Sequence, residues 1–378
     1  METFFFDIDS GVFVGRRAPF CIFLFGGAGV NLDMLKVTKD ISDFAMSSQL
    51  GLLEVQVDKP VTFALFLAGI EIFSVVYQPD SSHRVNIWDL GSLMEASLIN
   101  EVVAECSYKL TADNETAITK KFHVQFCRLN IPFEASRFVR GYFLSVLAGH
   151  DKITVPGREE SVAISTPATS GGVTQPVVVE QTFISEKLVK RVVSRTIATY
   201  SEGAVSVIPV SSSLFQLEGF KLLRYTVICG ARRQTFRLAR HVPVGTGFKF
   251  RNSFGVMEYC YLAGLVKVKP DFERVETRIR GELHAFVQVE RREYTVSSGA
   301  VSFTEMPLID DLVRSDQVFL LTGEQSIPVS IVDCDTSRSY DDHTLHAVEL
   351  TFVYAGTCPD SIVLPARIFD DTFDDTYE

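Results

Sequence analysis

The sequence lacks the short motifs that accompany the commonest catalytic chemistries. It contains no G-x-S-x-G and no H-E-x-x-H, so neither a serine-hydrolase turn nor a zinc-protease helix is indicated. Tryptophan is nearly absent, and Trp88 is the one residue of its type. One tryptophan gives little support for the aromatic stacking platforms of a carbohydrate-binding module. We therefore predict that the chain has no catalytic residues, no cofactor-binding residues and no metal ligands.

Long hydrophobic runs and export signals are also missing. The longest apolar stretches lie near Val61–Ile70 and Phe20–Val30, and both are too short to cross a bilayer as helices. The N-terminus has no basic region, and Asp7 and Asp9 interrupt its apolar run, so no signal peptide is indicated. We expect a protein without a membrane span that is made and folded in a cytoplasm.

Positive charge is scarce. The chain has 36 Lys and Arg against 47 Asp and Glu, a net charge of −11, which disfavours general nucleic-acid binding. Two local basic groups remain, and we interpret both as solvated strand faces. A nucleic-acid contact is the alternative for the first group and an acidic partner for the second. The first group is Arg232, Arg233, Arg237, Arg240 and Lys249, and the second is Lys187, Lys190, Arg191 and Arg195.

The cysteines do not form a metal or disulfide pattern. There are seven of them, an odd number, and no two have a C-x-x-C spacing. A zinc site needs clustered ligands, and a disulfide framework needs an oxidising compartment. We expect reduced and mostly buried thiols at Cys21, Cys106, Cys127, Cys229, Cys260, Cys334 and Cys358.

Three further patterns resemble functional sites without meeting their requirements. Gly26–Gly29 follows a strand-like run, but it is neither G-x-G-x-x-G nor a P-loop, so a turn explains it better than nucleotide binding. Asp333–Asp342 holds four carboxylates but lacks the glycine and terminal glutamate of an EF-hand, which favours a solvated loop over calcium binding. The pairs Glu159–Glu160 and Asp310–Asp311 are interpreted as exposed charges, not as a glycosidase pair.

The residues that are present are typical of β-structure. The chain has 30 Phe and many short runs of β-branched and aromatic residues between Gly, Pro, Ser and Asp clusters. Val177–Ile184, Ala204–Val210 and Val348–Tyr354 are examples. We predict a mainly β protein with two or more antiparallel β-sandwich or barrel-like domains and a few short helices.

Composition divides the chain at residues 155–175, which are rich in Pro, Gly, Ser and Thr. We predict an N-terminal β-rich domain at 1–154, a linker or long loop at 155–175, a C-terminal β-rich domain at 176–369 and an acidic tail at 370–378. Mean hydropathy is +0.17, which is apolar for a chain without a membrane span and suggests subunit interfaces.

Four local predictions can be compared directly with a structure. Helices are expected at Leu90–Val103 and Glu305–Ser315, the second because Pro307 starts it and Leu308, Leu312 and Val313 follow at helical spacing. A hairpin turn is expected at Glu290–Arg292. Arg251–Gly255 is expected to form a tight connection anchored by Phe250 and Phe254, because Asn252 and Gly255 tolerate left-handed backbone angles.

Two stretches of the C-terminal half carry a family resemblance. The first is Phe248–Glu258, reading F-K-F-R-N-S-F-G-V-M-E. The second is Leu308–Tyr354, in which I-P-V-S-I-V-D at 327–333, a Ser/Tyr/Asp loop and L-T-F at 350–352 follow a short acidic helix and a strand. Together they resemble uncharacterised structural proteins found among the tail genes of phages and prophages of Bacteroides-type bacteria.

The resemblance implies a non-enzymatic virion component of a phage tail, at the tail tip, baseplate or connector. Its partners would be other copies of itself, in a homo-oligomeric ring, and other tail proteins. It would be assembled in the host cytoplasm and located in the virion. The alternatives are a carbohydrate- or receptor-binding β-sandwich module and, third, a glycan-active enzyme on an all-β fold.

Overall fold

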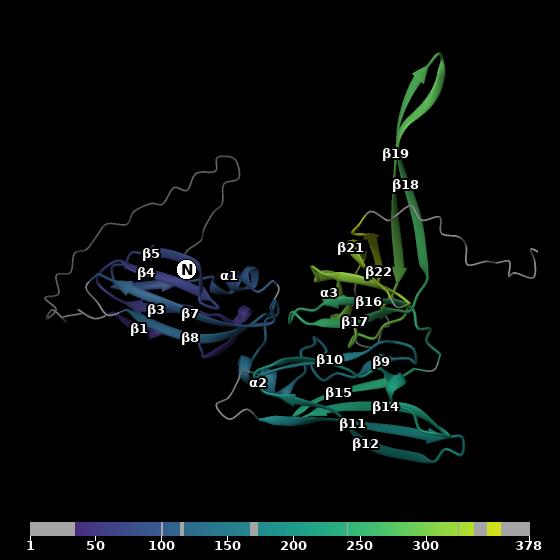
Figure 1. The fold of residues 1–378 in the computed structure, drawn as a ribbon, viewed down its shortest axis with the longest axis horizontal. Coiled ribbons are helices and arrows are strands. Elements are labelled where there is room, and N and C mark those ends of the chain that lie inside the picture. The colour runs from purple at the N-terminus through teal and green to yellow at the C-terminus, as the bar shows by residue number, and fades with distance from the viewer. Residues whose placement is uncertain are drawn as a thin grey trace, which may run out of the picture.

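A computed structural model describes residues 35–99, 101–113, 117–166, 173–239, 241–323, 325–335 and 346–356, with the backbone alone at 271–275 and 285–291. Antiparallel sheets dominate these ranges, so the prediction of a mainly β protein is confirmed. The sheets form three groups along the chain, called here the N-terminal, middle and C-terminal units (Figure 1). Cys21, Gly26–Gly29 and the acidic tail lie outside the described residues.

The N-terminal unit consists of two sheets around one core. Val55, Phe63, Leu110 and Val124 come from both sheets and are fully buried in that core. Side chains of the longest strand alternate between buried and exposed, as expected of a sandwich strand. One sheet has the order β1(Lys36–Lys39), β3(Leu53–Gln56), β6(Arg84–Ile87), and the other β2(Phe44–Met46), β8(Ile118–Gln125), β7(Val103–Ala112), β4(Val61–Leu67), β5(Ile70–Tyr77).

The middle unit also packs two sheets on a core, which includes Val177, Tyr200, Tyr225 and Phe236. The larger sheet has the order β12(Lys190–Ser201), β11(Thr174–Ser185), β14(Phe220–Cys229), β15(Arg232–Leu238), β9(Lys152–Thr154). The smaller sheet pairs β10(Ser161–Ser165) with β13(Val205–Pro209).

The segment expected to be a linker differs from that prediction. Residues 161–165 form β10, because the apolar triplet Val162–Ile164 supplies two residues to the middle core, and Arg158 and Glu160 just before it are buried. The Pro/Gly/Ser composition agrees with the loop at residues 156–160. This loop is held in place by buried residues on both sides of residue 160. Residues 167–172 lie outside the described residues.

The C-terminal unit is a seven-stranded sheet covered by a helix. Phe248, Phe250, Leu312, Leu350 and Phe352 form its core. The strand order is β17(Met257–Leu262), β16(Thr246–Arg251), β20(Val318–Thr322), β21(Gln325–Asp335), β22(Glu349–Tyr354), β19(Glu282–Ser297), β18(Val266–Ile279).

The described helices are short. The helix expected at Glu305–Ser315 is confirmed as α3(Met306–Arg314), with Pro307 in its first turn. The helix expected at Leu90–Val103 ends earlier, as α1(Leu90–Ser97), because the β-branched residues after it lead into β7. The others are α2(Ala135–Gly141) and the 3-10 turns η1(Ser47–Gln49) and η2(Ser212–Leu214).

A separate apolar cluster lies where the three units meet. Met46 and Cys127 come from the N-terminal unit, Ala163 from the middle unit and Phe254 from the C-terminal unit. Phe138, on α2, stacks on Phe254 with ring centroids 5.1 Å apart. Because all three units bury residues in this cluster, the junction forms a fourth hydrophobic core beside those of the three units.

The turn around Asn252 is as expected, and the one predicted at Glu290–Arg292 is wrong. Gly255 has φ +79° and donates its amide to the Asn252 carbonyl, while Phe250 and Phe254 are buried. Residues 290–292 are instead inside β19, paired with β18, and the chain reverses at Arg280–Gly281. Both turn residues have positive φ, which a two-residue hairpin requires.

Candidate functional site

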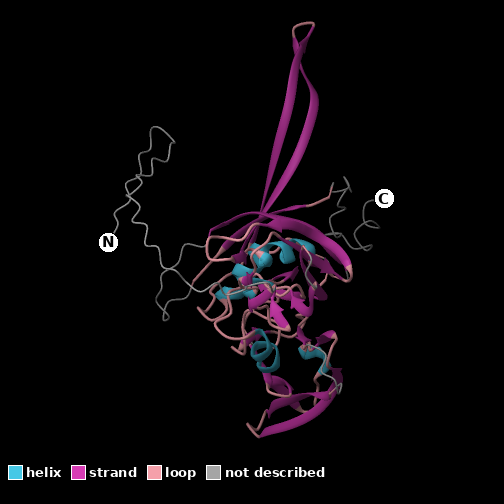
Figure 2. Ribbon diagram, turned by 90° about the vertical axis from the view of Figure 1, so that its left-hand side faces the viewer, coloured by secondary structure: helices cyan, strands magenta, loops and turns pink. Residues whose placement is uncertain are grey.

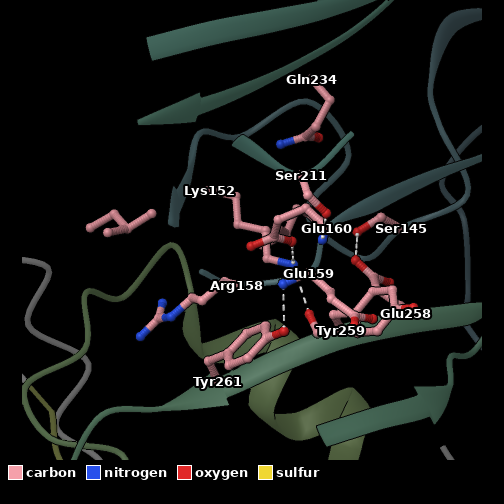
Figure 3. A network of polar contacts seen from close by, with 12 residues as sticks. Ser145, Lys152, Arg158, Glu159, Glu160, Ser211, Gln234, Glu258, Tyr259 and Tyr261 are labelled. Carbon is pink, nitrogen blue, oxygen red and sulfur yellow. Dashed lines mark hydrogen bonds and ion pairs between the residues drawn. The ribbon is translucent and has the colours of Figure 1, made fainter. Parts of the chain in front are cut away.

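A buried polar network lies between the middle and C-terminal units (Figure 3). Lys152, on β9, donates from Nζ to Glu160 Oε2 at 2.6 Å and to the Tyr259 carbonyl at 2.7 Å. The exposed fractions of the two side chains are 7% and 0%. A buried cation of this kind is tolerated only when it is paired and hydrogen-bonded, and here both conditions are met.

A second carboxylate, Glu258 on β17, completes the network. It accepts hydrogen bonds from Ser145 Oγ at 2.7 Å and from Asn252 Nδ2 at 2.8 Å. Burial raises the pKa of Glu258, and the nearby Lys152 ammonium opposes that shift. The pKa of Lys152 is raised because the neighbouring carboxylates outweigh its burial.

A small cavity beside this network limits what chemistry can occur there. It measures about 20 Å³ and is lined by Ser145, Lys152, Gln234 and Glu258 among others. That volume holds about one water molecule, whereas substrate pockets measure hundreds of cubic ångströms. The three charged groups therefore serve as a joint between two units, with no room for a substrate beside them.

Arg158 extends the joint at its edge. Its guanidinium donates to the carbonyls of Val244 at 2.8 Å and Pro243 at 3.1 Å, and lies 5.0 Å from the centroid of the Tyr261 ring. The Tyr261 hydroxyl accepts the Glu159 amide at 2.7 Å. These contacts fix the loop between β9 and β10 on the C-terminal sheet.

The structure corrects the interpretation of three side chains as exposed charges. Glu160 is buried in the joint, and Asp311 is buried under the β16–β17 turn, where it accepts the Ser253 amide at 3.1 Å and the Ser253 hydroxyl. Arg232 is buried too, and donates to the Val139 carbonyl at 2.7 Å. Glu160 pairs with Lys152 only eight residues earlier, but both are buried by strands from other parts of the chain. The partners of Asp311 and Arg232 lie 58 and 93 residues away, so no local pattern could have identified them.

The other flagged residues are spread over the surface. Arg233 and Arg237 are exposed and Arg240 is outside the described residues, so with Arg232 buried the first basic group is not one patch. The second group, on and before β12, is exposed as expected. Of the carboxylate loop, only Asp333 and Asp335 are described, both in β21.

Cysteine and metal chemistry have limited scope in the described part. Cys106, Cys127, Cys229 and Cys260 are buried free thiols. Burial raises the pKa of Cys106 and Cys260 to about 12, which suppresses thiolate formation at neutral pH. Among the described residues, His, Cys, Asp and Glu do not gather in threes as a metal site would require.

No helix in the described ranges is long and apolar enough to cross a membrane.

The most conspicuous surface feature is the β18–β19 ribbon, called here the arm (Figures 1 and 2). At its base β19 pairs with β22 through residues 294–297, whereas its remaining residues pair only with β18. The part of β19 that pairs only with β18, Glu282–Glu293, spans about 40 Å at the usual strand rise. The described side chains at 266–270 and 276–284 are all exposed.

Comparisons with known proteins give no family. No family model matches the sequence, and no curated protein matches it. The chain has weak structural similarity to the extracellular region of plexin A4, with 8% identity, a TM-score of 0.19, and coverage of 85% of this chain and 36% of that one. The E. coli alpha-2-macroglobulin gives 10% identity, a TM-score of 0.19, and coverage of 72% and 22%.

A calcium-stabilised ice-binding adhesin of an Antarctic bacterium gives 12% identity, a TM-score of 0.13, and coverage of 70% of this chain and 68% of that one. The chain thus spans about a third of the plexin A4 extracellular region and about a fifth of the alpha-2-macroglobulin.

Proposed function

We propose that the chain is a structural protein of a phage tail that acts by oligomeric assembly and protein–protein contacts. The arm is the observation that carries this proposal. A two-stranded ribbon isolated in water is marginally stable, so one that leaves its sheet for about 40 Å needs a neighbouring surface. The tail assignment itself rests on the sequence resemblance in residues 248–258 and 308–354.

The arm's side chains support a protein partner. Val266, Val268, Ile279 and Leu283 are exposed apolar residues, and they alternate with charged ones along both strands. Protein interfaces surround apolar anchors with a polar rim, and the exposed apolar residues of the arm supply such anchors among polar neighbours. The base of the arm is fixed to the C-terminal core by Val296, which is fully buried.

An arm-shortened variant tests the assembly role. Deleting residues 270–292 and joining Lys269 to Glu293 through Asn-Gly removes the free ribbon but keeps the paired base. Light scattering at micromolar concentration should show closed oligomers for the wild type and monomers for the variant, with unchanged melting of the body. A monomeric wild type, or a variant that assembles normally, would contradict the assembly role.

The tail assignment needs a separate experiment on particles. Particles induced from the strain that encodes the chain should contain its tryptic peptides in fixed ratio to other tail proteins. A gold-labelled antibody should mark the tail and not the capsid. Absence of the chain from purified particles would refute the virion assignment and leave the receptor-binding alternative.

A further inference from the structure

We propose that β5 pairs with β5 of a second copy of this chain, as antiparallel edge strands related by a two-fold axis at Val75. β5 lies at one edge of the larger N-terminal sheet, and within the described residues it pairs only with β4 (Figure 1). The outward amides and carbonyls of an edge strand can continue its sheet into another chain. This contact rests on the assembly function proposed above and is made in addition to that of the arm.

β5 exposes apolar side chains along its open edge. The exposed fractions of Ile70, Val75 and Val76 are 71%, 37% and 58%. The strand reads I-E-I-F-S-V-V-Y, without Lys, Arg or Pro, and its one charge, Glu71, lies near its start. The irregularity in its pairing with β4 lies there too, so Phe73–Tyr77 is a regular and uncharged stretch. An edge of this kind is a template for pairing with another strand.

The two longer edge strands, β12 and β18, are protected in ways that β5 is not. Charged side chains at an edge oppose pairing with another strand, and proline removes a donor from the ladder. The protecting residues are Lys190, Arg191 and Arg195 in β12, and Lys267, Lys269 and Pro270 in β18. The contrast indicates that β5 is the edge at which this chain accepts a partner strand.

The sequence of β5 is complementary to itself about Val75. A two-fold axis perpendicular to the sheet places Val75 opposite Val75 of the second copy and Phe73 opposite Tyr77. These three residues pair with β4 residues of the N-terminal core, so the new pairs extend that core. On the outer face Ser74 lies opposite Val76. Aromatic and β-branched cross-strand pairs stabilise a sheet, and no like charges meet in this register.

Other segments of the chain match β5 less well. β12 or β18 would set lysines and arginines against its apolar side chains, and those cations would have to lose water without gaining a counter-charge. The apolar stretch Phe20–Phe25 could add to β5, but it reads F-C-I-F-L-F and would itself become an uncharged apolar edge. Two-fold pairing of β5 covers both open edges at once, which favours the second copy as the partner.

Symmetry determines how this contact combines with that of the arm. A ladder over Phe73–Tyr77 is small beside the roughly 1,200 Å² that stable interfaces bury, so it cannot hold two chains together alone. It forms where the arm has already gathered several copies, because each copy then repeats it. Two-fold contacts between two closed rings give a double ring. The mass of the oligomer should therefore be an even multiple of 42.1 kDa.

Two double variants on the outer face of β5 test the contact by light scattering. Ser74→Lys combined with Val76→Lys places lysine opposite lysine across the two-fold axis and should halve the mass of the oligomer. Ser74→Lys combined with Val76→Glu places lysine opposite glutamate and should keep the full mass. Both positions are exposed in the single chain, so neither variant should lower the melting temperature of the body.

A disulfide identifies the partner residue. Val75→Cys lies on the two-fold axis, so oxidation of the oligomer should join two chains through residue 75. Ile70→Cys is the matched control, because position 70 is more exposed but lies five residues from the axis, beyond the reach of a disulfide. Mapping of the linked peptides distinguishes this bond from one to the native Cys21.

The possible failures can be told apart. Equal masses for the two double variants, with residue 75 unlinked, would refute the β5 contact while leaving assembly through the arm intact. A bond between residue 75 and Cys21 would show that residues 1–34 cover the edge and would also refute the contact. A monomeric wild type would overturn the assembly function and this contact together.

Discussion

The guanidinium of Arg251 lies 4.2 Å from the centroid of the Phe126 ring and donates to the Leu98 carbonyl at 3.0 Å. Arg251 belongs to β16 of the C-terminal unit, whereas Phe126 and Leu98 belong to the N-terminal core. Asp316 holds the other side of the guanidinium at 3.4 Å. This one side chain therefore bridges units that are separated by the whole middle unit in sequence.

Arg251→Met should loosen the N-terminal unit from the rest. The substitution keeps much of the side-chain volume but removes the contact with the Phe126 ring and one of two donors to the Leu98 carbonyl, which also accepts the Glu101 amide. We therefore expect a loss of about 2 kcal/mol. Hydrogen exchange at residues 98–102 and chemical denaturation measure the effect. Arg195→Met, at an exposed position on β12, serves as the control and should change neither.

Gly255→Val should destabilise the protein more than Gly69→Val does. Both glycines have φ near +80°, which costs a β-branched residue about 1–3 kcal/mol. A Cβ at Gly255 would in addition lie 3.1 Å from a Phe126 ring carbon, whereas at Gly69 it would meet nothing within 4 Å. Equal losses in thermal unfolding would show that the contact with Phe126 is unimportant.

Amide substitution at the two buried glutamates of the joint should have unequal effects on the free energy of unfolding. Glu160→Gln leaves the Lys152 ammonium buried without a counter-charge 2.6 Å away, so we expect a loss of about 3–5 kcal/mol at neutral pH. Glu258→Gln should be tolerated, because burial already disfavours the charged carboxylate. Denaturation at pH 7 distinguishes the two, and similar losses would contradict the distinct roles.

The pH dependence of stability should also change in Glu258→Gln. Burial in the folded protein raises the pKa of Glu258 above its ordinary value of 4.5. The contribution of Glu258 to stability is therefore fully present below pH 4.5 and is lost as pH rises through the folded-state pKa. The variant lacks this loss. Its melting temperature relative to the wild type should therefore rise with pH from about 4.5 upward, and parallel curves would contradict the shift.

Thiol labelling should separate buried from accessible cysteines. Cys106, Cys127, Cys229 and Cys260 are buried, and burial raises the pKa of each thiol. At pH 8 an aromatic disulfide reagent should leave these four unmodified in the native protein and titrate all seven cysteines after denaturation without reductant. Rapid native labelling at any of the four would show that its strand opens.

Much of the fold follows from local patterns. Alternation in β7, Pro307 at the start of α3 and the Asn252–Gly255 turn each depend on neighbours within a few residues, so the sequence was sufficient to predict them. The turn at Arg280–Gly281 was missed because polar Glu290–Arg292 resembles a turn more closely than a Gly after Arg does. Polar residues suit a ribbon exposed on both faces as well as they suit a turn.

The polar joint could not be predicted in the same way. Lys152 and Glu160 are close in sequence, but Glu258 and Tyr259 come from a strand about a hundred residues later. Their burial depends on β9 joining the edge of the middle sheet in parallel with β15. Such a pairing is set by the whole topology, and the surrounding composition indicated only a loop.

The place of β22 in the C-terminal sheet has a consequence for synthesis on the ribosome. β22 is the last described strand, yet it lies between β21 and β19 and fixes the base of the arm. The N-terminal core draws only on residues 35–126 and can close early, while the arm's support is incomplete until residue 354 has emerged. A nascent or prematurely terminated chain would therefore lack a firmly held arm, and under the proposed assembly role only finished chains would be competent to join a complex.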